Sequence, residues 1–132
     1  MTQLDEVERG VIETVAEALA KAPSTITLGS NLMRDLGAES LDFLDIVFKL
    51  EQQFAIQITR GEMERATRGD MTDDEFAPKG VISERGLDRL RELLPEAAPL
   101  IKPGLRAAQI LSLFSVQTFV NIVKGKQAGQ TI

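Results

Sequence analysis

The 132-residue chain contains no cysteine, histidine, tyrosine or tryptophan. Without cysteine it has no disulfide and no thiolate, either as a nucleophile or as a metal ligand. Without histidine it lacks the commonest general base and the commonest metal-binding side chain. A catalytic site would have to be built from serine, lysine, arginine and carboxylates, so we expect neither enzymatic activity nor a metal site.

Long hydrophobic runs are absent as well, since no apolar stretch approaches the roughly 18 residues that span a bilayer. Residues 1–6 have no basic region and no apolar stretch behind them, which predicts no secretory signal and a cytoplasmic location. Hydrophobic residues still make up 43% of the chain, enough for the core of one domain. We therefore expect no stable membrane insertion.

The net charge of −5 is unevenly distributed along the chain. Residues 1–58 hold four basic and ten acidic side chains, whereas residues 59–132 hold eleven basic and ten acidic ones. An acidic first half disfavours nucleic acid and anionic membranes as its partners and favours basic protein surfaces. An acidic face that serves only solubility is an equally good interpretation of charge alone.

The spacing of apolar residues predicts an all-helical chain. A first helix is expected over residues 3–22, capped by Thr2 and ended by Pro23, and a short third one over 60–65. Residues 72–75 match a capping box, and Leu87, Leu90 and Leu94 form a helical stripe in the segment that follows. A last helix should begin after Ser115 and end before Gly125.

The second helix, residues 40–54, carries two apolar faces, with Ser40 at its N-cap position. One face fits a core: Phe43, Ile46, Val47, Leu50 and Phe54. The other contains Leu41, Leu44 and Phe48, with Asp45 among them. Periodicity alone leaves open whether this second face lines an interior, is buried in a central helix, or meets a partner.

Residues 35–42 read Asp-Leu-Gly-Ala-Glu-Ser-Leu-Asp, and residues 43–54 continue Phe-Leu-Asp-Ile-Val-Phe-Lys-Leu-Glu-Gln-Gln-Phe. A serine before an apolar-periodic run is by itself usually an N-cap. This string, however, resembles the attachment motif of acyl carrier proteins, and residues 3–64 and 115–123 resemble that family's helices. The resemblance implies that Ser40 bears a covalent 4′-phosphopantetheine, whose thiol would carry acyl groups as thioesters in a chain without cysteine.

The resemblance also implies the partners, namely a phosphopantetheinyl transferase and acyl-synthesising and acyl-transferring enzymes with basic docking surfaces. Acidic contacts would come from Glu39, Asp42, Asp45 and Glu51, and apolar contacts from Leu41, Leu44 and Phe48. Glu39 departs from the aspartate that usually precedes the serine, and Lys49 lies on a helix that is more uniformly acidic in many relatives. The second departure could narrow the set of partners.

We expect a single domain over residues 1–132, monomeric, with a four-helix carrier core of residues 3–65 and 115–125. The segment 66–114, which typical family members lack, would be an inserted helical element. The string 40–48 is also similar to specialised carriers for very-long-chain acyl transfer to lipid A, which are longer after the third helix. A lid over a long acyl chain and a simple extension of the bundle are both compatible with this insertion.

Two alternatives to a fatty-acid or lipid carrier remain open at this level. One is a carrier of polyketide or aminoacyl intermediates, because the motif does not identify the cargo. The other is a helical interaction protein in which Ser40 is an unmodified cap. A small hydrolase or transferase ranks behind both, given the missing histidine and cysteine.

Overall fold

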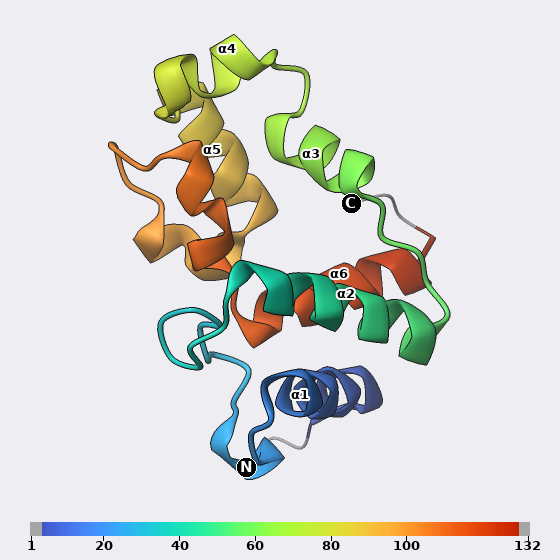
Figure 1. Ribbon diagram of the computed structural model, residues 1–132. Coiled ribbons are helices and arrows are strands. Elements are labelled where there is room, and N and C mark those ends of the chain that lie inside the picture. Colours follow the sequence, from blue (N-terminus) through green and yellow to red (C-terminus); the bar gives the residue numbers. More distant parts are fainter. Residues whose placement is uncertain (1–3, 130–132) are drawn as a thin grey trace. The chain divides into compact units, whose positions relative to one another are not determined.

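The computed structural model of the chain describes residues 4–129 (Figure 1). Within them, β-type pairing is limited to two isolated bridges, Asn31 with Ser115 and Val81 with Arg106. The prediction of an all-helical fold is confirmed. The α-helices are α1 (Glu6–Leu19), α2 (Ser40–Phe54), α3 (Arg60–Arg68), α4 (Asp73–Phe76), α5 (Glu84–Leu93) and α6 (Val116–Gln127). Short 3₁₀ helices cover Pro23–Thr25, Pro78–Gly80, Pro95–Leu100 and Ala107–Leu113.

The chain forms two compact units. The first contains residues 4–58 and 114–129, with α1, α2 and α6, and the second contains residues 59–113, with α3, α4 and α5. The sequence grouped the third helix with the carrier core and began the insertion at residue 66, whereas the second unit begins at Thr59. Whether the chain functions as one domain stays a prediction.

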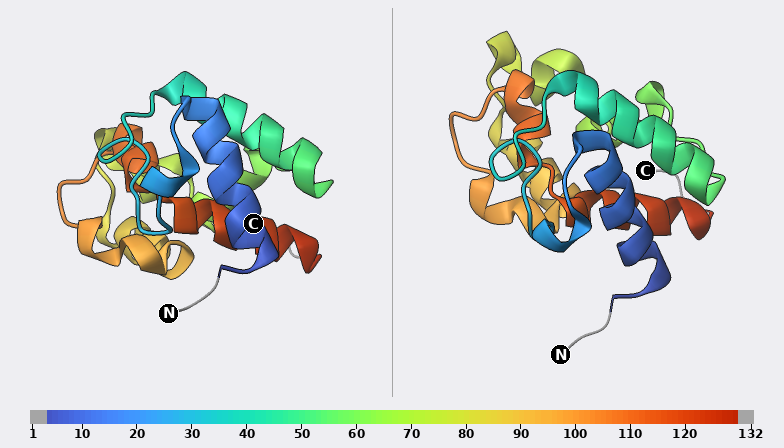
Figure 2. Two further views of the ribbon diagram at one scale, coloured as in Figure 1. Left: turned by 90° about the horizontal axis from the view of Figure 1, so that it is seen from below. Right: turned by 60° about the horizontal axis from the view of Figure 1, so that its bottom comes forward.

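In the first unit, α1 packs against both α2 and α6, and α2 also contacts α6 (Figure 2). Asp5 begins α1 with a capping box, because its N–H donates to Glu8 Oε1 at 2.9 Å and its carboxylate accepts from the Glu8 N–H at 2.8 Å. The expected cap, Thr2, lies outside the described residues. Side chains that are almost completely buried form the core: Val11, Val15, Leu32, Ile46, Leu50, Val116, Phe119, Val120 and Val123.

Helices α1 and α2 approach each other closely at Gly10. A Cβ atom placed there would lie only 2.8 Å from Cζ of Phe54, so a larger residue would force that ring to move. One turn further along α1, the buried Thr14 hydroxyl donates to Oε1 of Gln53 at 2.7 Å. The small residue and the polar pair together fix how α2 lies against α1.

The last helix begins after Ser115, as predicted. The Ser115 hydroxyl accepts the Thr118 N–H at 3.4 Å. Phe114, directly before this cap, and Phe119, four residues after it, pack with their ring centroids 5.6 Å apart, which is the arrangement of a hydrophobic staple. The expected end before Gly125 was wrong, since α6 continues to Gln127. Gly125 keeps helical geometry because a glycine ends a helix only where the chain turns left-handed.

The second unit has a core of its own. Its helix α5 packs against α3, α4 and the 3₁₀ helix Pro95–Leu100. The capping box of residues 72–75 is confirmed at the start of α4, where the Glu75 N–H donates to the Thr72 hydroxyl. Of the predicted helical stripe, Leu87 and Leu90 lie on α5, and Leu94 follows its last residue. All three are buried, together with residues from the surrounding segments: Met71, Phe76, Ile82, Ala97 and Ile101.

Candidate functional site

Ser40 is the first residue of α2 and is exposed. The structure corrects its predicted role as N-cap, because that position belongs to Glu39, whose backbone is extended. The carboxylate of Asp42, at the third helical position, accepts the Glu39 N–H at 2.7 Å, which is the reciprocal bond of a capping box. The Ser40 hydroxyl has no hydrogen-bond partner among the described residues. A role as the N-cap of α2 therefore does not explain why a serine occupies this position.

The loop that leads into Ser40 is held by hydrogen bonds at several points. The Asp35 carboxylate accepts the Asn31 N–H at 2.8 Å, and the Arg34 guanidinium donates to the same carboxylate at 3.1 Å. The Arg34 side chain, followed by the Asn31 amide, holds the pKa of the Asp35 carboxyl below its ordinary value. Gly37 then turns with a φ of 71°, in the left-handed region that favours glycine.

This loop is also fastened to the segment that precedes α6. The Leu32 N–H donates to the Phe114 carbonyl at 3.0 Å, and the Val116 N–H donates to the Ser30 carbonyl at 3.0 Å. Leu32 itself is completely buried. Ser40 is thus presented by a loop with a fixed backbone, even though the loop is long.

The two apolar faces of α2 have different surroundings. On the first, Phe43, Ile46 and Leu50 are at most 4% exposed. On the second, Leu41 is 75%, Leu44 67% and Phe48 57% exposed. A central helix buried on two sides and a wall around an interior are both inconsistent with these values. A contiguous exposed apolar face is typical of a surface that meets a partner.

The four acidic residues expected to contact partners fall into two groups. Glu39 and Asp45 are exposed. Asp42 and Glu51 are half-buried, and each has a bond within the chain, Asp42 to the Glu39 N–H and Glu51 to the Ile58 N–H at 2.9 Å. Glu51 therefore fastens the chain where it leaves α2. Its predicted role as a partner contact stays a prediction.

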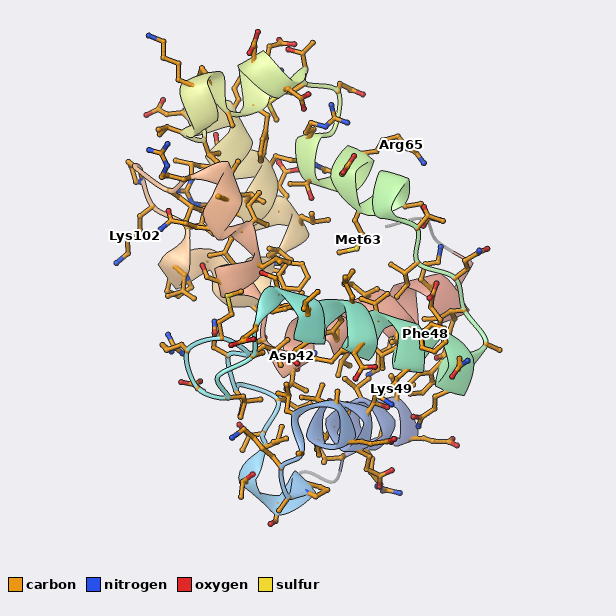
Figure 3. The ribbon with its side chains drawn as sticks, in the orientation of Figure 1. Asp42, Phe48, Lys49, Met63, Arg65 and Lys102 are labelled. Carbon is orange, nitrogen blue, oxygen red and sulfur yellow. The ribbon has the colours of Figure 1, made fainter. Side chains whose placement is uncertain are left out.

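Lys49, the basic residue of α2, is directed toward α1 (Figure 3). Its ammonium group lies 3.4 Å from Oε1 of Glu17. The contact partly neutralises the positive charge of Lys49. This contact was not expected, because residues 32 positions apart give no local signal in a sequence.

Three phenylalanine rings pack together in the first unit, one turn after Ser40. The Phe43 ring lies 5.9 Å from that of Phe114 and 6.2 Å from that of Phe119, between ring centroids. The sequence placed Phe43 and Phe119 on core faces but missed Phe114. A sequence signal for Phe114 was available: an apolar residue directly before a helix cap often packs against one four positions after the cap.

Comparison with known proteins agrees with this geometry. Residues 9–73 match the family model described as a phosphopantetheine attachment site. An acyl carrier protein of Campylobacter hominis is 40% identical over 60 residues, which cover 46% of this chain and 76% of that protein. The chain belongs to the acyl carrier protein family.

Two further acyl carrier proteins show the same extent of similarity. That of Amoebophilus asiaticus is 36% identical over 46% of this chain and 76% of its own length. That of Rickettsia canadensis is 40% identical over 47% of this chain and 72% of its own length. No solved structure gives a significant match. The protein is therefore an acyl carrier and not a catalyst, and it takes a covalently attached 4′-phosphopantetheine.

The described residues fit such a group. A free, exposed hydroxyl at the first position of a 15-residue helix is accessible for ester formation. The N-terminal N–H groups and the helix dipole favour the resulting phosphodiester anion. Among residues 4–129, no helix is long and apolar enough to cross a bilayer, and no three carboxylates converge as a metal site would require.

Proposed function

We propose that the Ser40 hydroxyl is the attachment point of the 4′-phosphopantetheine. The observation that carries this proposal is the free hydroxyl, together with the assignment of the capping bond to Asp42 rather than to the serine. When bound, the group supplies the thiol on which acyl groups are held as thioesters. The chain's own contribution is to present the hydroxyl at a helix N-terminus on a fixed loop.

Intact-mass measurement after incubation with coenzyme A and a phosphopantetheinyl transferase tests this assignment. The wild-type chain should gain the mass of the group, and the Ser40→Ala variant should gain none. Ser24→Ala is the matched control, because Ser24 is another exposed serine, in the 3₁₀ helix Pro23–Thr25. Modification of Ser40→Ala, or its loss in Ser24→Ala, would show that the attachment site lies elsewhere.

We further propose that the exposed face of α2 is the docking surface for the transferase and for acyl-handling enzymes. Leu41, Leu44 and Phe48 form its apolar part, and Glu39 and Asp45 its acidic part. Burial of a leucine that is 67% exposed contributes roughly 1–2 kcal/mol to a complex. Leu44→Ala should therefore lower the kcat/KM of modification about 5- to 30-fold while leaving the stability of the free chain unchanged.

Two comparisons separate docking from folding. Leu4→Ala is the apolar control, since Leu4 is 37% exposed but lies before α1, and it should leave the rate of modification unchanged. Among the acids, Asp45→Asn should slow modification most at low salt without lowering stability, because its charge is free to steer a basic partner. Glu51→Gln should instead lower stability, because it weakens the bond to the Ile58 N–H. Equal effects of both acid substitutions on modification would contradict this division.

We also propose that the cargo is a long acyl group destined for lipid, including very-long-chain transfer to lipid A, and that the carrier works in the cytoplasm. The resemblance of residues 40–48 to carriers of that kind, and the presence of a second compact unit after α2, support this cargo. Hiding a longer chain from water favours additional apolar cover, by about 0.8 kcal/mol per methylene. Mass spectrometry of the carrier isolated from its native cells tests the proposal. Acyl groups of ordinary length, or polyketide or aminoacyl groups, would contradict it.

A further inference from the structure

Two segments of the second unit contain no acidic residue. The segments 77–82 and 97–113 contain no aspartate or glutamate, although the unit as a whole holds ten. The two segments lie side by side, because Val81 and Arg106 form an antiparallel bridge and the Ile82 N–H donates to the Leu105 carbonyl at 2.9 Å. The tertiary structure thus joins two acid-free stretches that are separate in the sequence.

The bases of these segments, Lys79, Lys102 and Arg106, are exposed and have no ion pair among the described residues. Four arginines of α3 and α5 are instead paired with carboxylates: Arg68, Arg85, Arg89 and Arg91. The Arg106 guanidinium lies over the backbone next to Lys79, because a Cβ at Gly80 would be 3.5 Å from its Nη2 atom. Lys102 points away from its segment into solvent (Figure 3).

Partly exposed apolar side chains occur in the same segment as Lys102 and Arg106. Leu100 is 38% exposed, two residues before Lys102, and Leu105 and Ile110 are half-buried. We call the set Lys79, Leu100, Lys102 and Arg106 the basic corner. Long basic side chains beside partly exposed aliphatic ones are the composition of surfaces that lie on a bilayer, where the charges reach the headgroups and the aliphatic groups contact the acyl boundary.

We propose that the basic corner binds reversibly to the surface of an anionic phospholipid bilayer. Its free cations complement the headgroup charge, and their spread over two segments suits a fluid array of phosphates better than one shaped site. Single-stranded nucleic acid is a poorer occupant, because its bases stack on aromatic rings and the corner has none. The proposal does not depend on the modification of Ser40, so the two can fail separately.

Binding should be weak, because the whole chain carries a net charge of −5 and the same bilayer repels its acidic parts. Each basic side chain near an anionic surface strengthens binding about fivefold, so three account for roughly 100-fold. The interaction should fall steeply with salt, as expected for exposed charges. It would bring the carrier to the surface where acyl groups are built into lipid without inserting any helix.

Flotation of the full chain with vesicles tests the proposal. The wild type should float with vesicles that contain phosphatidylglycerol at low salt and remain unbound with phosphatidylcholine alone. The triple variant Lys79→Gln, Lys102→Gln and Arg106→Gln should lose at least about 10-fold in binding, while its circular dichroism spectrum stays that of the wild type. Leu100→Ala should weaken binding by a smaller factor.

A second triple variant controls for net charge. It combines Arg9→Gln, Lys21→Gln and Arg65→Gln, which remove three exposed bases elsewhere and alter the net charge equally. It should bind to within about twofold of the wild type. Equal loss in both triple variants would show a bulk charge effect and overturn the proposal. So would a wild type that does not distinguish the two kinds of vesicle.

Discussion

The start of α2 offers a sharp test of which side chain holds the helix and which is free for chemistry. In the structure, the Asp42 carboxylate accepts the Glu39 N–H at the start of the helix, and the Ser40 hydroxyl makes no hydrogen bond within the described chain. Replacing Asp42 should therefore destabilise the protein, and replacing Ser40 should not. This reverses the usual expectation for a serine at the head of a helix.

The magnitude follows from two contributions. Loss of a capping hydrogen bond costs about 1 kcal/mol, and loss of a carboxylate in the first turn costs a further 0.3–1 kcal/mol of favourable interaction with the helix dipole. Asp42→Ala should thus lose about 1–2 kcal/mol in free energy of unfolding. Asp42→Asn keeps an acceptor oxygen and should lose roughly 0.3–1 kcal/mol. Ser40→Ala should stay within about 0.5 kcal/mol of the wild type, because alanine is a good helix former and no bond is removed.

Urea unfolding followed by far-ultraviolet circular dichroism is the suitable assay, since the chain has neither tryptophan nor tyrosine to report by fluorescence. Thermal unfolding provides a second reading, in which Asp42→Ala should lower Tm by about 3–8 °C. A loss of 1 kcal/mol or more in Ser40→Ala, combined with no loss in Asp42→Ala, would refute the assignment. The serine would then be a structural cap, and the argument for its chemical role would lose its main support.

Further substitutions test the packing of the first unit and one of its ion pairs. Phe114→Ala should lose about 3–5 kcal/mol, measured by urea unfolding, because a ring that is 6% exposed leaves a cavity in the aromatic cluster; a loss below 1 kcal/mol would contradict this. Gly10→Ala should lose about 1–3 kcal/mol by the same assay, and Phe54→Leu on that background should restore part of it by relieving the contact. Lys124→Gln should raise the pKa of Asp5 toward its ordinary value of 3.8, because the hydrogen bond from the Lys124 ammonium group is the largest cause of its lowered pKa. NMR titration of Asp5 measures this change. Since that pKa is depressed in the folded state, the contribution of the pair to stability is present at neutral pH and is lost as the pH falls below about 4; Lys124→Gln should flatten this acid dependence.

The bounds of α2 were predicted correctly at both ends because its signals are local. A glycine-containing turn precedes Ser40, an unbroken amphipathic pattern follows, and Phe54 is the last apolar residue in register. The identity of the cap was not predictable in the same way. Serine, glutamate and aspartate within four positions all have a suitable oxygen, and only the backbone conformation decides which of them accepts the N–H.

The two faces of α2 show a second limit of sequence reasoning. Periodicity placed Leu41, Leu44 and Phe48 on a separate face, but it carries no information about what covers that face. Their exposure depends on where other elements pack, which is set by contacts between residues far apart in the sequence. The same holds for the second unit, whose helices were anticipated from leucine spacing and capping patterns, while the joining of segments 77–82 and 97–113 was not.

The ion pair between Lys49 and Glu17 has a consequence for how this carrier selects its enzymes. Since Glu17 pairs with the lysine from α1, a change in that helix can release a positive charge beside the exposed apolar face of α2. Carriers that share an identical α2 can therefore differ in affinity for the same transferase through a single residue of α1. Attempts to exchange specificity between carriers by grafting α2 alone should transplant Glu17 with it.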